Sequence, residues 1–221
     1  MSEISCLIFD AGDLLYYRRR KSHNILREVV SRIAKRNIKF SEEDLLLFYE
    51  LRELSYRGII SRKKRIFLFL KHLGISEKHL EKIFNIYDKI LQESTIFYKN
   101  VPDTLRGLKS KGYRLATLSD SDYSAKEKMI WFRKADIAEL FDAVICSCDI
   151  GYCKPEERAY FAVLEKLGAE PEEAIFIGHS VKDLLGARNI GLKTIALRCL
   201  IKSREIADVY IKDFKDLLQI A

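Results

Sequence analysis

Long apolar runs are absent from this sequence of 221 residues. No stretch approaches the roughly 18 uncharged apolar residues that a membrane-spanning helix needs, so the sequence predicts no association with a membrane. The first residues, MSEISCLIFDAGD, reach an acidic side chain at Glu3 and contain no basic segment, which does not fit a secretory signal. Because 48% of the residues are apolar, a packed core can form. We therefore expect a folded cytoplasmic protein.

Cysteine is scarce, odd in number, and spaced unlike a common zinc site. Three of the five cysteines form a C-x-C-x4-C pattern at Cys146, Cys148 and Cys153, which matches no usual zinc spacing. Cys6, Cys146 and Cys199 lie in or beside apolar segments, where a free cysteine acts as a small hydrophobic residue. We therefore expect structural thiols and no zinc.

The formal charge of +7 is unevenly distributed along the chain. Residues 14–100 contain 20 Lys and Arg against 10 Asp and Glu, a net charge of +10, and the rest of the chain has a net charge of −3. A positive field attracts small anionic substrates or nucleic acid. An ordinary solvent-exposed helical surface rich in Lys and Arg would have the same excess of positive charge. Both interpretations stay open, and the sequence leaves the oligomeric state unspecified.

Residues 22–93 carry the pattern of helices. Apolar residues at 25, 26, 29, 30 and 33 recur every three or four positions, as in one stripe of an amphipathic helix. Ser41, with Asp44 three residues later, resembles a capping box that opens a second helix. A third helix is predicted through IFLFLKHL up to Gly74, and Ser76 is predicted to cap a fourth. Four helices therefore follow one another with no strand between them.

The rest of the chain alternates between strands and helices. Residues 4–9, ISCLIF, are typical of a strand covered on both faces. Later strands are predicted at 114–118, 142–146, 174–178, 194–197 and 208–211, and helices at about 102–111, 122–139, 156–168 and 182–190. This alternation predicts an α/β fold, a Rossmann-like doubly wound parallel sheet. We expect its core in residues 1–15 and 95–221, with a four-helix cap inserted at 16–94.

Polar residues follow four of the predicted strands, where the functional groups of open α/β sheets collect. Asp10 follows the first strand in F-D-A-G-D, and Ser119 ends the second in L-S-D-S-D. Lys154 lies in G-Y-C-K-P after the third, and G-H-S-V-K-D places His179 and Asp183 after the fourth. Each of these residues alone also fits a cap or a turn. Together, in this order, they predict one site that combines carboxylates, a hydroxyl and an ammonium.

This order of motifs resembles that of the haloacid-dehalogenase-like (HAD) superfamily of hydrolases, and the resemblance covers essentially the whole chain. The helical insertion after the first motif corresponds to the C1 cap of subfamily I. The resemblance implies that Asp10 attacks phosphorus, or carbon in dehalogenases, to form a covalent aspartyl intermediate. It also implies that Ser119 binds oxygens of the transferring group, that Lys154 offsets negative charge, and that Asp10 and Asp183 bind Mg²⁺.

The resemblance further implies a small anionic, phosphorylated substrate. Gly12 and Asp120, which neighbour the first two motifs, are expected to contact it. The basic cap would cover the site, exclude water and select the substrate.

Two positions depart from the phosphatase pattern. The first is Gly12, where the pattern has a second Asp that protonates the leaving group, and here Asp13 comes next. General acid–base catalysis raises a reaction rate by about 10²–10⁴-fold, so the loss of this Asp predicts a slow phosphatase. The backbone carbonyl of Gly12 could still bind a metal. One hypothesis is that Asp13 replaces the missing acid, because Asp tolerates a left-handed turn.

The second departure is His179, which stands where the pattern has a metal-binding Asp. An imidazole at this position alters the Mg²⁺ site, either as a ligand or only as a hydrogen-bonding neighbour.

Three functions therefore stay open, and the leading hypothesis is a phosphatase-like HAD hydrolase. The second is a metal-independent 2-haloacid dehalogenase, because that branch also lacks the second Asp and K-P-E-E-R-A-Y is similar to its third motif. Against it, Asp120 stands where dehalogenases carry Asn, and Gly12 where they carry Tyr. The third is a catalytically impaired HAD fold that binds a partner, such as nucleic acid, through its basic cap.

Overall fold

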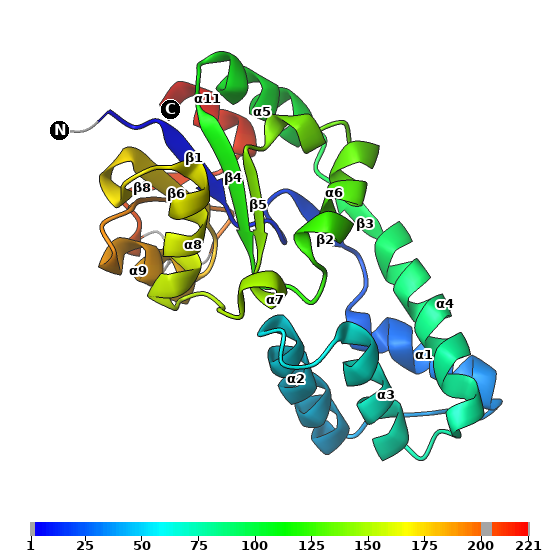
Figure 1. Ribbon diagram of the computed structural model, residues 1–221. Helices are drawn as coiled ribbons and strands as arrows, with labels where there is room; N and C mark the ends of the chain where they lie inside the picture. The colour runs from blue at the N-terminus through cyan, green and yellow to red at the C-terminus, as the bar shows by residue number, and fades with distance from the viewer. Residues whose placement is uncertain (1–2, 200–204, 221) are drawn as a thin grey trace.

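The computed structural model of this chain describes residues 3–199 and 205–220, and its core is a parallel β-sheet (Figure 1). The sheet has six strands in the order β5–β4–β1–β6–β7–β8. The strands are β1 (Cys6–Phe9), β4 (Arg114–Ser119), β5 (Ala143–Cys146), β6 (Ala174–Gly178), β7 (Lys193–Leu197) and β8 (Val209–Ile211). All six predicted strands are confirmed to within two residues at each end.

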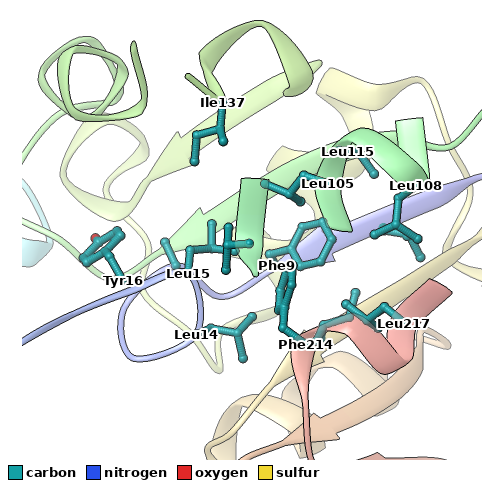
Figure 2. Close-up of a cluster of buried hydrophobic side chains, with 14 of the residues drawn as sticks. Phe9, Leu14, Leu15, Tyr16, Leu105, Leu108, Leu115, Ile137, Phe214 and Leu217 are labelled. Carbon is teal, nitrogen blue, oxygen red and sulfur yellow. The ribbon is translucent and has the colours of Figure 1, made fainter. Parts of the chain in front are cut away.

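Successive residues of β1 face opposite layers of helices. Leu7 and Phe9 belong to the apolar cluster beneath α5 (Val101–Ser110) and α6 (Ala125–Lys134). Cys6 and Ile8 belong to the cluster beneath α8 (Glu157–Leu167) and α9 (Val181–Asn189). Figure 2 shows the first cluster, where Phe9 packs against Phe214 with ring centroids 5.6 Å apart. Because side chains alternate along a strand, both faces are buried, and the doubly wound architecture is confirmed.

Four helices form the inserted cap: α1 (Ser22–Ala34), α2 (Glu42–Tyr56), α3 (Arg62–His72) and α4 (Leu80–Glu93). They share an apolar cluster of their own, apart from the two clusters of the core. The predicted capping box is confirmed, since the Asp44 N–H donates to Ser41 Oγ at 3.1 Å and the Ser41 N–H donates to Asp44 Oδ2 at 2.8 Å. The predicted Ser76 cap is wrong: a 3₁₀ turn, Glu77–His79, comes first, and the Ser76 side chain makes no capping bond.

Two short strands that the sequence analysis missed connect the core to the cap. β2 (Tyr16–Arg18) and β3 (Thr95–Phe97) pair antiparallel, with Tyr16 opposite Phe97 and Arg18 opposite Thr95. Three residues are too few to show a period of two, so no pattern marked them. The pair holds the outgoing and returning segments side by side and places Tyr16 and Arg18 on one face. The domain boundaries at 15/16 and 94/95 stay a prediction.

The helix predicted over 122–139 is shorter than expected. α6 begins after Ser124, whose hydroxyl and Glu127 form a capping box, and it ends at Lys134. Asp136 then adopts a left-handed φ of 55°, which a continuing helix cannot accommodate, and a 3₁₀ turn follows at Ala138–Leu140. A one-turn helix, α7 (Ser147–Ile150), was not predicted. Within residues 3–199 and 205–220, no helix has the length and apolar character to cross a bilayer.

Candidate active site

A polar pocket of about 390 Å³ lies where the C-terminal ends of β1, β4 and β6 meet. All the residues that the sequence predicts for the site line it: Asp10, Gly12, Asp13, Ser119, Asp120, Lys154, His179 and Asp183. The residues after β1, β4 and β6 converge because these strands are parallel neighbours, so their polar ends point to the same edge of the sheet. Lys154 reaches the same edge from the loop that follows β5 and α7. Their chemical roles stay predictions.

Lys154 is the centre of the charged contacts in the pocket. Its Nζ lies 2.8 Å from Asp10 Oδ1 and 3.2 Å from Asp183 Oδ2, and its side chain is almost fully buried. Asp120 fixes the loop, because its Oδ1 accepts the backbone N–H of Lys154 at 3.0 Å. Burial opposes the charged form of Lys154, but the carboxylates of Asp10 and Asp183 outweigh it and raise its pKa above the usual range. The side chain is therefore an ammonium at neutral pH.

Asp10 and Ser119 present oxygen atoms from adjacent strands. The Asp10 backbone N–H donates to the Ile177 carbonyl at 2.9 Å, which anchors the residue to the end of β6. Its Oδ2 lies 3.4 Å from His179 Nδ1. Ser119 Oγ is buried and makes no hydrogen bond to any residue in the described part of the chain. A carboxylate and a hydroxyl thus face the pocket at the ends of β1 and β4.

The turn after Asp10 contains Gly12 and Asp13, the two residues that differ from the phosphatase pattern. Asp13 adopts a left-handed φ of 57°, and its N–H donates to the Tyr16 carbonyl at 2.8 Å. Its side chain is exposed and lines the pocket. A Cβ built on Gly12 would meet no atom within 4 Å. A Cβ at position 12, where the phosphatase pattern has Asp, would therefore meet no steric obstacle.

The acidic residues fit a divalent cation held by few protein ligands. In the described residues, no group of three or more His, Cys, Asp or Glu side chains is arranged to hold a metal ion. Lys154 binds one oxygen of Asp10 and one of Asp183, and the other oxygen of Asp183, Oδ1, is buried without a hydrogen-bond partner. Proteins usually hold Mg²⁺ through one or two carboxylates, with water and substrate phosphate completing its shell. Asp10 and Asp183 meet that minimal requirement.

Comparison with known proteins identifies the family. The model of the haloacid dehalogenase-like hydrolases matches residues 4–191. The chain belongs to this family of hydrolases. Pyrophosphatase PpaX from Bacillus cereus (strain G9842) is 31% identical to this HAD-like hydrolase over 159 residues, which cover 66% of this chain and 71% of the relative.

Solved structures of the superfamily share the whole fold of this HAD-like hydrolase. A 2-haloacid dehalogenase from Pseudomonas syringae pv. tomato DC3000 has a TM-score of 0.75 at 17% identity, with 98% of this chain and 97% of that chain covered. A predicted phosphoglycolate phosphatase from Haemophilus somnus 129PT has a TM-score of 0.70 at 19% identity, with 100% and 99% covered. At these identities the likeness shows the fold alone.

No sequence pattern marked the pocket wall that the cap and α6 supply. Arg65, from α3, is buried and pairs with Asp122 through an Nη2–Oδ2 distance of 3.1 Å. The excess of Lys and Arg in residues 14–100 indicated positive charge in this region. The spacing of these residues along the sequence did not indicate which of them face the site. The further residues on this wall include Arg18, Arg52, Tyr123, Lys128 and Trp131.

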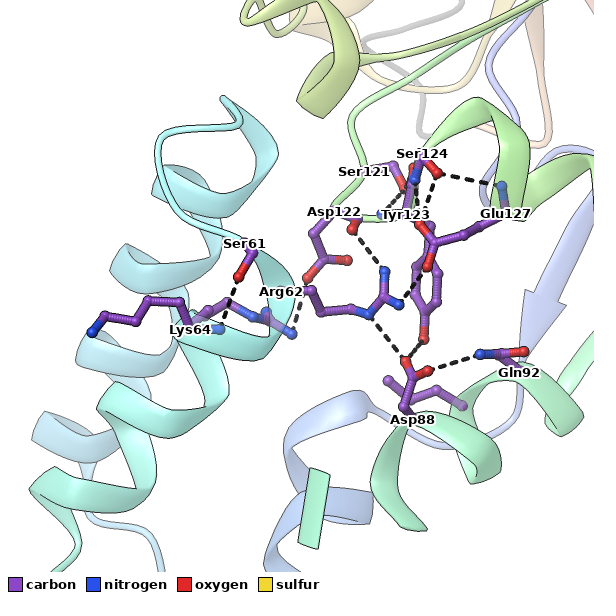
Figure 3. A network of polar contacts seen from close by, with 12 residues as sticks. Ser61, Arg62, Lys64, Asp88, Gln92, Ser121, Asp122, Tyr123, Ser124 and Glu127 are labelled. Carbon is purple, nitrogen blue, oxygen red and sulfur yellow. Dashed lines mark hydrogen bonds and ion pairs between the residues drawn. The ribbon is translucent and has the colours of Figure 1, made fainter. Parts of the chain in front are cut away.

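Arg62 joins the cap of this HAD-like hydrolase to its core (Figure 3). Its guanidinium pairs with Asp88 of α4 at 3.0 Å and with Glu127 of α6 at 2.6 Å. It also donates to the Asp122 carbonyl at 2.8 Å and lies 3.7 Å from the centroid of the Tyr123 ring. Asp122 and Tyr123 belong to the loop that follows Ser119, so this network attaches the cap directly to the site.

We expect Arg62→Ala to lower the free energy of unfolding by about 2–3 kcal/mol, because it leaves Asp88 and Glu127 without the cation between them. Urea denaturation measures the change. Lys64→Ala is the matched control, since Lys64 is exposed on the same helix, and it should change stability by less than about 0.5 kcal/mol. Equal effects of the two substitutions would show that the Arg62 network contributes nothing to stability.

Proposed function

We propose that this HAD-like hydrolase is a phosphatase-type enzyme that uses Asp10 as the nucleophile on a small phosphorylated substrate. The observation that carries the proposal is the contact between Lys154 Nζ and Asp10 Oδ1, 2.8 Å long, at the edge of a polar pocket. The ammonium orients the carboxylate and offsets the charge that accumulates when an anionic phosphoryl group approaches it. The relative named as a pyrophosphatase and the structure named as a phosphoglycolate phosphatase support a phosphorylated substrate.

The proposed reaction has two steps. An Asp10 oxygen attacks phosphorus and the bond from phosphorus to the leaving oxygen breaks, which gives an aspartyl phosphate. The Ser119 hydroxyl, buried without a protein partner, donates to a phosphoryl oxygen, and Lys154 balances the negative charge. Water then attacks the same phosphorus, which releases phosphate and restores the Asp10 carboxylate. The leaving oxygen takes a proton, for which Asp13 is the nearest carboxyl group along the chain.

We also propose that Asp10 and Asp183 hold Mg²⁺, with the Gly12 carbonyl as a further oxygen ligand. When bound, the cation would supply positive charge to the phosphoryl oxygens. His179, with Nδ1 3.4 Å from Asp10 Oδ2, orients the carboxylate and is not required as a ligand. Its imidazole suits later transition metals better than Mg²⁺.

Dehalogenation is the second candidate, because a 2-haloacid dehalogenase shares the fold and His179 replaces a metal-binding Asp. One experiment separates the candidates: phosphate release from p-nitrophenyl phosphate, pyrophosphate and phosphoglycolate, with and without Mg²⁺, beside chloride release from 2-chloropropionate. We expect phosphate release that Mg²⁺ stimulates. Chloride release without phosphate release would replace the proposal with dehalogenation. Release of neither product, with salt-sensitive binding to DNA or RNA, would favour the impaired binding protein.

A further inference from the structure

A second buried lysine lines the pocket from the side away from Lys154. Lys128, on α6, is only 2% exposed, and its Nζ lies 5.8 Å from the centroid of the Tyr16 ring. Its electrostatic neighbours include Tyr16 and Cys146, and Cys146 ends β5. Lys154 instead pairs with Asp183, which follows β6. Lys154 Nζ lies 5.7 Å from the ring centroid of Phe176, in the cluster beneath α8 and α9, whereas α6 covers the other face of the sheet. The two lysines therefore reach the pocket from opposite faces of the sheet.

Lys128 differs from Lys154 in having no carboxylate partner. Across the described residues, no Asp or Glu oxygen lies within 4.0 Å of its Nζ, whereas Lys154 pairs with two carboxylates. Burial acts to lower the pKa of Lys128, but Tyr16, Cys146 and Asp10 act in the opposite direction, and its pKa is raised. A buried ammonium with a hydrogen bond to the Tyr16 phenol but no carboxylate in contact is costly. An anion bound in the pocket would supply a negative charge in direct contact with it.

Arg18 provides a second cation on the same wall. Its guanidinium carbon lies 5.5 Å from the ring centroid of Trp131, which is one helical turn from Lys128. The rings of Trp131 and Tyr16 are 5.9 Å apart, which links Arg18 to the neighbourhood of Lys128. Arg18 Nε donates to the Leu91 carbonyl at 3.2 Å, and the guanidinium pairs with no carboxylate in the described part of the chain. Its remaining N–H groups are therefore available to an anion.

We propose that Lys128 and Arg18 bind a second anionic group of the substrate, beside the phosphoryl group that is transferred to Asp10. This inference rests on the proposed function and narrows the substrate class to compounds that carry a second phosphoryl or carboxylate group close to the first. Lys154 is already shared by two carboxylates, so a second anionic group needs other cations. A pocket of about 390 Å³ suits a small metabolite of this kind.

The test compares the binding of methylenediphosphonate, which has two anionic groups, with that of methylphosphonate, which has one. Titration calorimetry in metal-free buffer measures both affinities without turnover, because the P–C bonds resist hydrolysis. We expect the unsubstituted chain to bind methylenediphosphonate at least about tenfold more tightly. Lys128→Met should weaken its binding by about 10- to 100-fold, while methylphosphonate binding changes by less than about threefold. Lys126→Met, which removes an exposed charge from the same helix, should change neither affinity.

Lys128→Arg keeps a cation at this position, and we expect it to retain most of the preference for methylenediphosphonate. It also provides a second folded variant, with folding checked by a thermal melt. Equal losses for the two probes in Lys128→Met, unchanged binding, or no binding of methylenediphosphonate to the unsubstituted chain would each overturn the inference. Failure of the proposed function can be told apart from failure of this inference. If only the proposed function fails, the protein releases no phosphate but still binds methylenediphosphonate more tightly than methylphosphonate.

Discussion

Replacing Asp10 with Asn should lower phosphate release by at least about 10³-fold, to the rate of the uncatalysed control. The amide has nearly the same shape but lacks the anionic oxygen that attacks phosphorus. The fold should persist, because the backbone bond from Asp10 to Ile177 is kept and Lys154 retains Asp183 as a partner. Steady-state turnover of p-nitrophenyl phosphate, beside urea denaturation of the same samples, measures both effects.

Asp10→Glu is the control that separates nucleophilic attack from simple charge balance. It keeps a negative charge for Lys154 but moves the carboxylate by one methylene group. A misplacement of about 1 Å in a reacting group costs roughly 10²-fold, so we expect this variant to be nearly inactive too. Full activity in Asp10→Glu would mean that Asp10 supplies charge and is not the attacking group. Substantial turnover in Asp10→Asn would mean that neither its charge nor its nucleophilic oxygen is needed.

Restoring the missing acid at position 12 should accelerate the enzyme. We expect Gly12→Asp to raise turnover of alkyl phosphates by about 10- to 100-fold, because general acid help contributes about 10²–10⁴-fold when it is fully in place. The backbone accepts a side chain here, since a Cβ at Gly12 meets no atom within 4 Å. The gain should be much smaller for p-nitrophenyl phosphate, whose leaving group departs readily without a proton. The ratio of the two rates is the measurement.

Gly12→Asn matches the size of the new side chain without its acid, and it should give no gain. An equal gain from Gly12→Asn would assign the effect to packing of the turn and not to proton transfer.

Asp13→Asn addresses the acid that is already present. Asp13 lines the pocket but is exposed and held in a left-handed turn, so we expect its help to be weak. The substitution should lower turnover of alkyl phosphates by about three- to tenfold. Unchanged turnover in this assay would remove Asp13 from the mechanism.

The sequence was sufficient to predict which edge of the sheet carries the polar pocket, because short apolar runs mark strands and polar residues follow their ends. Asp10 and Ser119 stand at strand ends, Lys154 and Asp183 come on the segments that follow β5 and β6, and the structure places all four in one pocket. Lys128 and Arg18 follow no such rule. They lie 110 residues apart, and they share a wall because Tyr16 and Arg18 of β2 pack against Trp131 of α6.

Local signals explain the other differences. Ser124 and Glu127 carry the capping-box pattern, and this signal could have fixed the start of α6. The three-residue strands β2 and β3 carry no periodic signal, because their pairing depends on where the cap leaves and rejoins the core. From the sequence, Arg62 is indistinguishable from the exposed Lys and Arg residues of the same helix. Only the structure shows that Asp88, Glu127 and Tyr123 surround it.

The central claim, that Asp10 is the nucleophile, is tested most directly by trapping the covalent intermediate. The chain is quenched in acid during turnover of p-nitrophenyl phosphate, digested and examined by mass spectrometry. The account predicts one phosphoryl group on Asp10, and none on the same peptide of Asp10→Asn. A phosphoryl group on another residue such as Asp13 or Asp183, or none on any residue while turnover proceeds, would contradict it.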